Sequence, residues 1–262
     1  MSIYIAFAKK KFMANMAYRF DHWMAILYSV LFVFIYWSLY RVLYGNHTEF
    51  DGITMSMVGT NFMISFVLGD AFAFDDQFLR NKISDGSIAN ELLRPVNFKL
   101  RILAENIGQT VFQLIYRSGP AFLFTCLWIG MKPPCSFVGF LLFIGSFILG
   151  YLVSWSLSFI IQTLSFWIIN VWSISTIKTV FVDVLAGIFL PIWFLPDVIR
   201  TICSFTPFES IYYGPVRIYL GMVSMKEIGI IYVKQIVWII ILSLIGDALW
   251  RRGQKKLVVQ GG

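Results

Sequence analysis

The sequence has little charge and few of the residues from which enzyme sites are built. Of its 262 residues only 13% are charged, whereas a soluble domain carries about 25% charged residues. It contains no G-x-x-x-x-G-K-[S/T] phosphate loop, no H-E-x-x-H zinc motif and no G-x-S-x-G nucleophile motif. The two histidines, His22 and His47, lie near opposite ends of one long apolar run, too far apart to share a metal. We therefore expect no catalytic residues, no metal site and no cofactor bound by this chain.

Apolar residues dominate instead. Hydrophobic residues make up 58% of the chain, aromatic residues 18%, and the mean hydropathy is +0.75. The many Phe, Tyr and Trp rings suit a lipid-facing surface and its interfaces. Since a membrane-spanning helix needs about 20 mostly apolar residues, a chain of this length has room for roughly six. The sequence therefore predicts an all-α integral membrane protein, with one transmembrane domain over residues 1–262.

Apolar segments of sufficient length recur along the chain. The expected spans are residues 23–44, 53–74, 103–131, 137–169, 174–195 and 228–250. The first of them continues for a full span behind a basic stretch, which is unlike a cleavable signal peptide.

Residues 1–21 precede the first span and are basic and amphipathic. Four apolar residues recur there at roughly helical spacing, namely Ile5, Phe12, Met16 and Phe20. A lysine run beside such a face suits lipid headgroups, so we expect an interfacial helix. The alternative is an ordinary basic flank before the first span.

The basic residues set the expected orientation, because Lys and Arg concentrate on the cytoplasmic side of membrane proteins. Residues 1–21 hold four of the 21 Lys and Arg residues, the loop 75–101 holds five, and the tail 251–262 holds four. The loop 45–52 has none. We expect both termini and the loop 75–101 to be cytoplasmic. The net charge of +7 then reflects this bias and not binding to nucleic acid.

Cysteine is scarce. Cys126, Cys135 and Cys203 form no C-x-x-C pair and indicate no metal site. We expect small apolar residues in or near the membrane. A Cys135–Cys203 disulfide is the alternative, because both residues fall near the outer face in this topology.

Residues 187–217 combine apolar composition with four of the eight prolines, each of which we expect to break or kink a helix. Broken backbone at membrane depth is tolerated only when it is buried in protein or lines a wet cavity. We therefore expect a re-entrant or interfacial hairpin on the outer side, and the alternative is an extracellular loop of apolar content. The expected gate residues of the hairpin are Gly187, Pro191, Pro196 and Pro207.

Polar residues within apolar segments are functional candidates, because placing them in lipid is costly. The candidates are Asn61, Asp70, Arg117 and Asp183. Arg117 lies roughly 24 Å past Arg101 along a continuous helix, near mid-membrane, where Asp70 or Asp183 would be its counter-charge. Alternatively, residues 96–112 lie in the interface and Arg117 reaches the headgroups. We expect Asn61 to bridge helices.

The longest charged stretch is the loop 75–101, and a membrane protein that gathers polar residues in one cytoplasmic loop offers that loop to a soluble partner. Asp85-Gly86 suits a turn. Ser87 suits the cap of a helix through residues 89–93, which Pro95 would end.

The end of this expected helix has the residues needed for docking. Leu92 and Leu93 suit an apolar groove, and Arg94 suits carboxylate or backbone acceptors on a partner. The alternative is a capped surface helix without a partner.

Motifs spread along the chain resemble the permease subunits of ABC-2 type exporters. The loop pattern is an Ile, a Gly three residues on, and then Leu-Leu-Arg-Pro, matched by Ile83, Gly86, Leu92, Leu93, Arg94 and Pro95. Phe166-Trp167 resembles the turn after the fourth span, residues 187–217 the outer hairpin, and Gly261-Gly262 the tail. The resemblance covers essentially the whole chain and is strongest to the six-span bacterial branch of antibiotic or multidrug export permeases.

The resemblance implies a type V exporter-like permease fold in a bacterial cytoplasmic membrane. Two permease subunits, identical or sister, would pair, and two ATPase subunits carrying ATP and Mg²⁺ would dock below. The implied coupling residues are Lys82, Ile83, Asp85, Gly86, Leu92, Leu93, Arg94 and Pro95. This chain would be a transport subunit and not an enzyme, and it would export an amphipathic or hydrophobic peptide, drug or lipid-like substrate.

Two other classes of function remain open. An ion-coupled secondary transporter would move substrate without an ATPase, although repeated halves and a charged relay are not evident in the sequence. A membrane enzyme would need clustered catalytic residues, and a scaffold would bind an ATPase without moving any solute.

Overall fold

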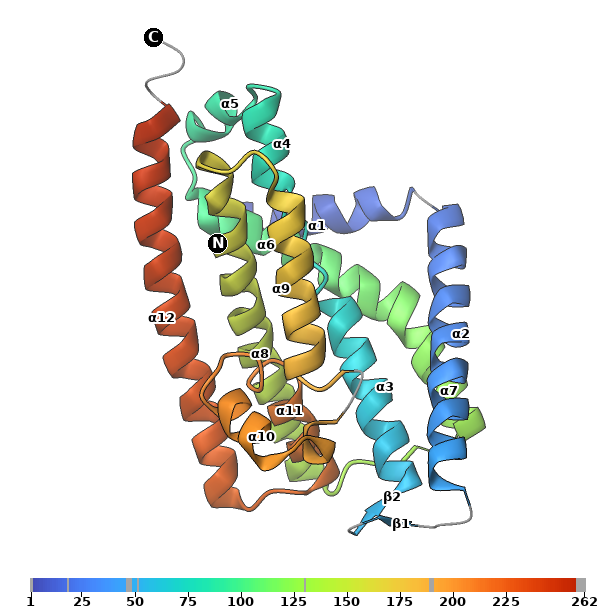
Figure 1. Cartoon of the computed structure of the whole chain (residues 1–262). Coiled ribbons are helices and arrows are strands. Elements are labelled where there is room, and N and C mark those ends of the chain that lie inside the picture. The colour runs from blue at the N-terminus through green and yellow to red at the C-terminus, as the bar shows by residue number, and fades with distance from the viewer. Residues whose placement is uncertain are drawn as a thin grey trace.

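The computed structural model describes residues 2–17, 19–45, 49–50, 52–129, 131–188 and 191–257, and nearly all of these are helical (Figure 1). His47 and the Gly261-Gly262 end lie outside the described residues. The helices are α1 (Ser2–Asn15), α2 (Arg19–Tyr44), α3 (Met55–Ala71), α4 (Phe78–Ser84), α5 (Ile88–Leu92), α6 (Phe98–Gln113), α7 (Gly119–Ile129), α8 (Phe137–Thr163), α9 (Val171–Leu185), α10 (Asp197–Ser204), α11 (Tyr213–Leu220) and α12 (Met225–Leu257). Strands β1 (Glu49–Phe50) and β2 (Ile53–Thr54) pair antiparallel.

The long helices run alongside one another, and the short ones gather at the two ends of the bundle. Figure 1 shows α4, α5 and the C-terminal end of α12 at one end, and β1, β2 and α10 at the other. α1 lies across the bundle near the first of these ends. The segments that carry most of the basic charge therefore share one end of the molecule, as the sequence predicts.

Three helices in the described part of the chain are long and apolar enough to cross a membrane, namely Phe20–Tyr44, Phe137–Phe166 and Met225–Leu257. They correspond to the first, fourth and sixth predicted spans. The chain is therefore a multi-pass membrane protein by the length and composition of its helices.

The second and fifth predicted spans differ from the observed helices. The second, predicted from residue 53, begins at Met55 because the two residues before it form β2, and its helix has 17 residues. The fifth was expected to reach residue 195, which is wrong, because α9 has 15 residues and ends at Leu185. Gly187 follows with a φ of 84°, a conformation that ends helices.

The third predicted span is helical from Leu103 to Ile129 but changes direction. α6 passes through a π-helical turn at Leu114–Ser118 into α7. The turn precedes Pro120, whose missing N–H interrupts the regular hydrogen-bond ladder. α6 packs along α1, and α7 packs against α2 (Figure 1).

The N-terminal helix is shorter than predicted. α1 ends at Asn15, so Phe20 belongs to α2 and not to the face of an interfacial helix over residues 1–21. The apolar residues of α1 also pack against the rest of the protein, since the Phe12 ring meets the Phe112 ring of α6 edge-on, with centroids 5.6 Å apart.

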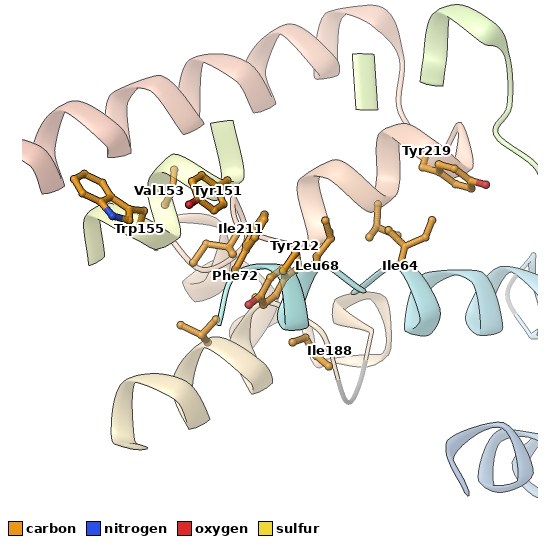
Figure 2. Close-up of a cluster of buried hydrophobic side chains, with 14 of the residues drawn as sticks. Ile64, Leu68, Phe72, Tyr151, Val153, Trp155, Ile188, Ile211, Tyr212 and Tyr219 are labelled. Carbon is orange, nitrogen blue, oxygen red and sulfur yellow. The ribbon is translucent and has the colours of Figure 1, made fainter. Parts of the chain in front are cut away.

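The main core lies between α3, α8 and the segment leading into α11. The Phe72 ring stacks on Tyr212 with centroids 5.7 Å apart and meets Tyr151 edge-on at 5.5 Å. Figure 2 shows these rings gathered with Leu68 and Ile188. Aromatic pairs of this geometry add to the stabilisation from apolar burial, so this cluster joins the segment 187–217 to the bundle.

The end of the segment 187–217 is packed against the bundle, whereas α10 within it is largely exposed. Val216 and Ile211 are fully buried, and α11 packs on α8 and α3. Pro196 precedes α10, as expected of a residue that starts a helix. Pro215, however, lies inside the first turn of α11, where its missing N–H is not needed, so the expectation that every proline here breaks a helix is wrong.

Candidate functional site

The loop 75–101 folds into two short helices, α4 and α5, joined by the turn at Asp85-Gly86. Gly86 has a φ of 73°, which side chains other than glycine rarely adopt, so the turn is as predicted. Asp85 Oδ1 accepts hydrogen bonds from the backbone N of Ser87 at 2.9 Å and from its Oγ at 2.6 Å. These bonds lower the pKa of the Asp85 carboxyl. Ser87 occupies the N-cap position of α5, as predicted, but its side chain makes no capping hydrogen bond, because its hydroxyl donates to Asp85.

The C-terminal end of α5 presents an apolar side chain to its surroundings. Leu93 is 82% exposed, whereas Leu92 is 37% exposed. Arg94 is half exposed, and its Nε lies 3.4 Å from Glu91 Oε2. Of the predicted docking residues, Leu93 is the one best placed to enter a groove on a partner.

A buried ion pair lies directly beneath this exposed residue. Arg101 Nη2 lies 2.7 Å from Glu91 Oε2 and Nη1 lies 2.9 Å from Glu105 Oε1, and the Glu91 and Arg101 side chains are only 7% and 4% exposed. The first contact has ion-pair distance without hydrogen-bond alignment. Lys82 Nζ lies 3.9 Å from Glu91 Oε1. The sequence shows Glu91 and Arg101 only as charges of the loop 75–101. The two residues lie on either side of Pro95, and their spacing does not show that they pair.

Arg101 also joins the other elements at this end of the bundle. Its guanidinium lies 5.6 Å from the ring centroid of Phe7 in α1 and 5.5 Å from that of Phe98 in α6. The Phe98 ring stacks on Trp250 of α12 with centroids 4.4 Å apart. Cations over aromatic rings are stabilised by the ring quadrupole. α5 is therefore connected, through Glu91 and Arg101, to α1, α6 and α12.

Asp76, which precedes α4, is held by two other helices. It is 4% exposed, and its Oδ1 accepts a hydrogen bond from Ser158 of α8. Its Oδ2 accepts from Ser175 Oγ at 2.5 Å and lies 2.5 Å from Lys178 Nζ, both in α9. Sequence reasoning did not identify this cluster. The available signal was Lys178 inside an apolar segment, a position where a basic residue needs a counter-charge.

Among the predicted intramembrane residues, Arg117 and Asp70 are brought together. Arg117 Nη2 lies 2.9 Å from Asp70 Oδ1, and Ser118 Oγ donates to Asp70 Oδ2 at 2.7 Å. Asp70 and not Asp183 is therefore the counter-charge. Arg117 lies in the π-helical turn that follows α6, and α6 packs along α1 (Figure 1), so the ion pair of the first alternative is formed.

Asn61 and Asp183 lie apart from this pair. Asn61 is fully buried in α3, and neither its Oδ1 nor its Nδ2 has a hydrogen-bond partner among the described residues, so the expected bridge between helices is not formed there. Asp183 lines a cavity of about 180 Å³ together with Asp76 and Lys178.

Neither a disulfide nor a metal-binding cluster is found in the described part of the chain. Cys126, Cys135 and Cys203 are all free thiols, so the alternative of a Cys135–Cys203 disulfide is wrong. Groups of three His, Cys, Asp or Glu residues that could hold a metal do not occur among the described residues.

Comparison with known protein families gives one match. The model of the family described as ABC-2 family transporter protein matches residues 26–261, which include α4, α5 and the buried ion pair beneath them. The search of curated proteins returned no match to this chain.

Proposed function

Because this chain belongs to the ABC-2 family of transporter proteins, and is thus a membrane permease of an ABC transporter, we propose that it is the export subunit of an ATP-driven complex. Two ATPase subunits, which bind ATP and Mg²⁺, dock on α4 and α5. Two permease subunits, identical or sister, pair in a bacterial cytoplasmic membrane. The substrate is an amphipathic or hydrophobic peptide, drug or lipid-like molecule.

We propose six spans, with both termini and the loop 75–101 on the cytoplasmic side. The spans would be α2, α3, α6 with α7, α8, α9 and α12. α3, at 17 residues, is about 26 Å long, close to the roughly 30 Å of a bilayer core. α9 is shorter, and the outer hairpin packs beyond its end. This arrangement supports a re-entrant segment that spans the remaining thickness of the membrane. The gate residues of that hairpin are Gly187, Pro191, Pro196 and Pro207.

The observation that carries the proposal is the exposed Leu93 on a helix anchored by a buried ion pair. A leucine exposed to this degree on a short helix suits an apolar groove on a partner. The Glu91–Arg101 contact keeps α5 from moving independently of α6. The remaining coupling residues lie in α4, in α5 and in the turns beside them, and they are Lys82, Ile83, Asp85, Gly86, Leu92, Arg94 and Pro95.

The mechanism follows from this anchoring. ATP binding by the partner would draw the two docked α5 helices together, and their ties to α1, α6 and α12 would carry that displacement into the membrane-embedded helices. ATP then shifts the equilibrium between inward-facing and outward-facing states by its differential affinity for them.

The test is co-purification of the ATPase encoded beside this gene, using a tag on this chain alone. Leu93→Glu places a charge in the docking surface and should abolish retention of the ATPase. The matched control is Val198→Glu, which places the same charge on a similarly short, exposed helix, α10, at the opposite end of the bundle; Val198 is 73% exposed. Arg94 is avoided because it contacts Glu91.

Retention with the control but not with Leu93→Glu supports the proposal. Equal retention in both variants contradicts docking at α5. If the wild-type chain retains no ATPase but moves solute in liposomes along an ion gradient, the ion-coupled alternative replaces the proposal.

A further inference from the structure

Two cavities adjoin where the chain passes from α1 to α2 and packs on the α6–α7 segment. The polar cavity, of about 360 Å³, is lined by Lys11, Asp21, Asp75, Gln113 and Arg117 among others. The apolar cavity, of about 450 Å³, is lined by Met16, Trp23, Ile26, Ile115, Tyr116 and Pro120. His22 and Phe112 line both, so the two cavities share a wall.

The shared wall is held in place by specific contacts. His22 Nε2 donates to the backbone O of Asn15 at 2.6 Å, which ties the end of α1 to α2. The His22 ring also packs on Phe112 of α6, with centroids 4.5 Å apart. A polar and an apolar compartment are thereby kept side by side, which is the arrangement an amphiphile requires.

The polar cavity presents charges of both signs. Lys11 and Arg117 supply cations, Asp21 and Asp75 supply carboxylates, and Arg117 is also paired with Asp70, whose Oδ1 lies 2.9 Å from Nη2. A purely anionic headgroup would meet the carboxylates unfavourably, and a purely cationic one would meet the cations. A group that has both a phosphate and an ammonium satisfies both pairs.

The same wall contains hydrogen-bonding groups that are not used within the described residues. Gln113 is buried, and its Oε1 has no hydrogen-bond partner there; the same holds for Arg117 Nε. Buried polar groups are ordinarily satisfied, so an acceptor and a donor without partners on residues that line a cavity favour a bound polar group there.

The apolar cavity begins at a residue typical of membrane interfaces. Trp23, near the start of α2, is largely exposed and marks the level where headgroups meet hydrocarbon. Ile115 and Tyr116 continue the apolar surface along the π-helical turn, so a chain entering here runs from the headgroup level toward the bilayer interior.

We propose that these two cavities bind one zwitterionic phospholipid of the surrounding membrane. The phosphate lies by Lys11 and Arg117, the ammonium by Asp21 and Asp75, and an acyl chain lies along Ile26 and Ile115. The bound lipid bridges α1, α2 and α6. This inference does not depend on which substrate the complex moves, nor on the ATPase.

The test uses the purified chain alone in nanodiscs of phosphatidylglycerol. A trace of phosphatidylethanolamine with a photoactivatable acyl chain is added, and labelled peptides are mapped by mass spectrometry. Labelling should concentrate on peptides containing Trp23 and Ile115, in spite of the excess of phosphatidylglycerol, and a photoactivatable phosphatidylglycerol trace should not label them above the rest of the surface.

Two variants and a matched control make the result specific. Ile115→Trp fills the apolar cavity and should abolish the selective labelling, and Ile26→Trp does the same from the opposite wall if the first variant fails to fold. The control is Ile240→Trp on α12, because Ile115 and Ile240 are 55% and 53% exposed. Lys11→Gln removes one charge-assisted contact and should weaken labelling about tenfold.

Equal labelling of the Ile115→Trp and Ile240→Trp variants would overturn the proposal, since the probe would then report only lipid surrounding the protein. Equal labelling by both photoactivatable lipids would also overturn it, because the cations and carboxylates of the polar cavity would not be selecting the headgroup.

Discussion

The contact between Glu91 and Arg101 can be measured directly, because it joins two side chains that are almost completely buried. We consider Arg101→Met and Glu91→Gln, alone and together. Arg101→Met leaves the buried Glu91 without its nearest cation, whereas Glu91→Gln leaves Arg101 with Glu105, whose Oε1 lies 2.9 Å from Nη1. Removing one partner of a buried pair costs about 3–5 kcal/mol. Lys82 and Arg94 remain near Glu91, and the Arg101 contact is not aligned as a hydrogen bond. We therefore expect about 2 kcal/mol for each single variant.

The double variant isolates the interaction between Glu91 and Arg101 from the interactions that each makes with its other neighbours. If the two charges interact, removing both should cost less than the sum of the single variants, with a coupling energy of about 1–2 kcal/mol. The measurement is equilibrium unfolding of the purified permease in mild detergent, completed as a double-mutant cycle. Additive single effects would refute the reasoning, since Glu91 and Arg101 would then act independently.

The Arg101→Met variant also distinguishes docking of the ATPase from transmission of its movement to the membrane helices. Arg101→Met leaves Leu93 exposed, so the ATPase should still co-purify, whereas substrate transport per ATP hydrolysed should fall. Loss of ATPase retention in Arg101→Met, with the fold intact, would show that the ion pair shapes the docking surface and does not act as a link behind it.

Three further predictions address other contacts. Asp76→Asn, which leaves a buried lysine without its carboxylate, should lower the free energy of unfolding by about 3 kcal/mol, measured by denaturant titration. Gly253→Ala in α12 should destabilise by about 1–3 kcal/mol, because its Cβ would come within 2.1 Å of the Phe166 ring, whereas Gly229→Ala in the same helix, with open space around it, should stabilise slightly, both measured by thermal unfolding. Ser87→Ala should raise the pKa of Asp85 toward its ordinary 3.8, measured by NMR titration. Since that pKa is lowered in the fold, the stabilisation exists above pH 3.8 and is lost as the pH falls through the folded value.

Much of the fold follows from local sequence. The helices α2, α8 and α12 coincide with three of the predicted apolar runs, because a long apolar helix satisfies both the backbone and the lipid over a full span. The turn at Gly86 and the end of α5 before Pro95 also follow from local chemistry, since one residue tolerates a positive φ and the other cannot continue a helix.

Element ends within continuous apolar sequence could not be predicted in the same way. The fifth segment remains apolar beyond Leu185, so hydropathy gives no signal that the helix ends there. The π-helical turn at Leu114–Ser118 has an ordinary helical composition, and only the following Gly119-Pro120 indicates a local irregularity.

The sequence by itself determined the class of protein, the helices that can cross a membrane, and the end of the bundle where the basic residues gather. Tertiary structure decided which charges meet. Arg117 had two candidate partners and pairs with Asp70, while Glu91 and Asp76 are held by Arg101 and Lys178. The reason is that a charge in an apolar environment must find a counter-charge, but composition does not say which one; only the packing of the helices brings two particular side chains within reach.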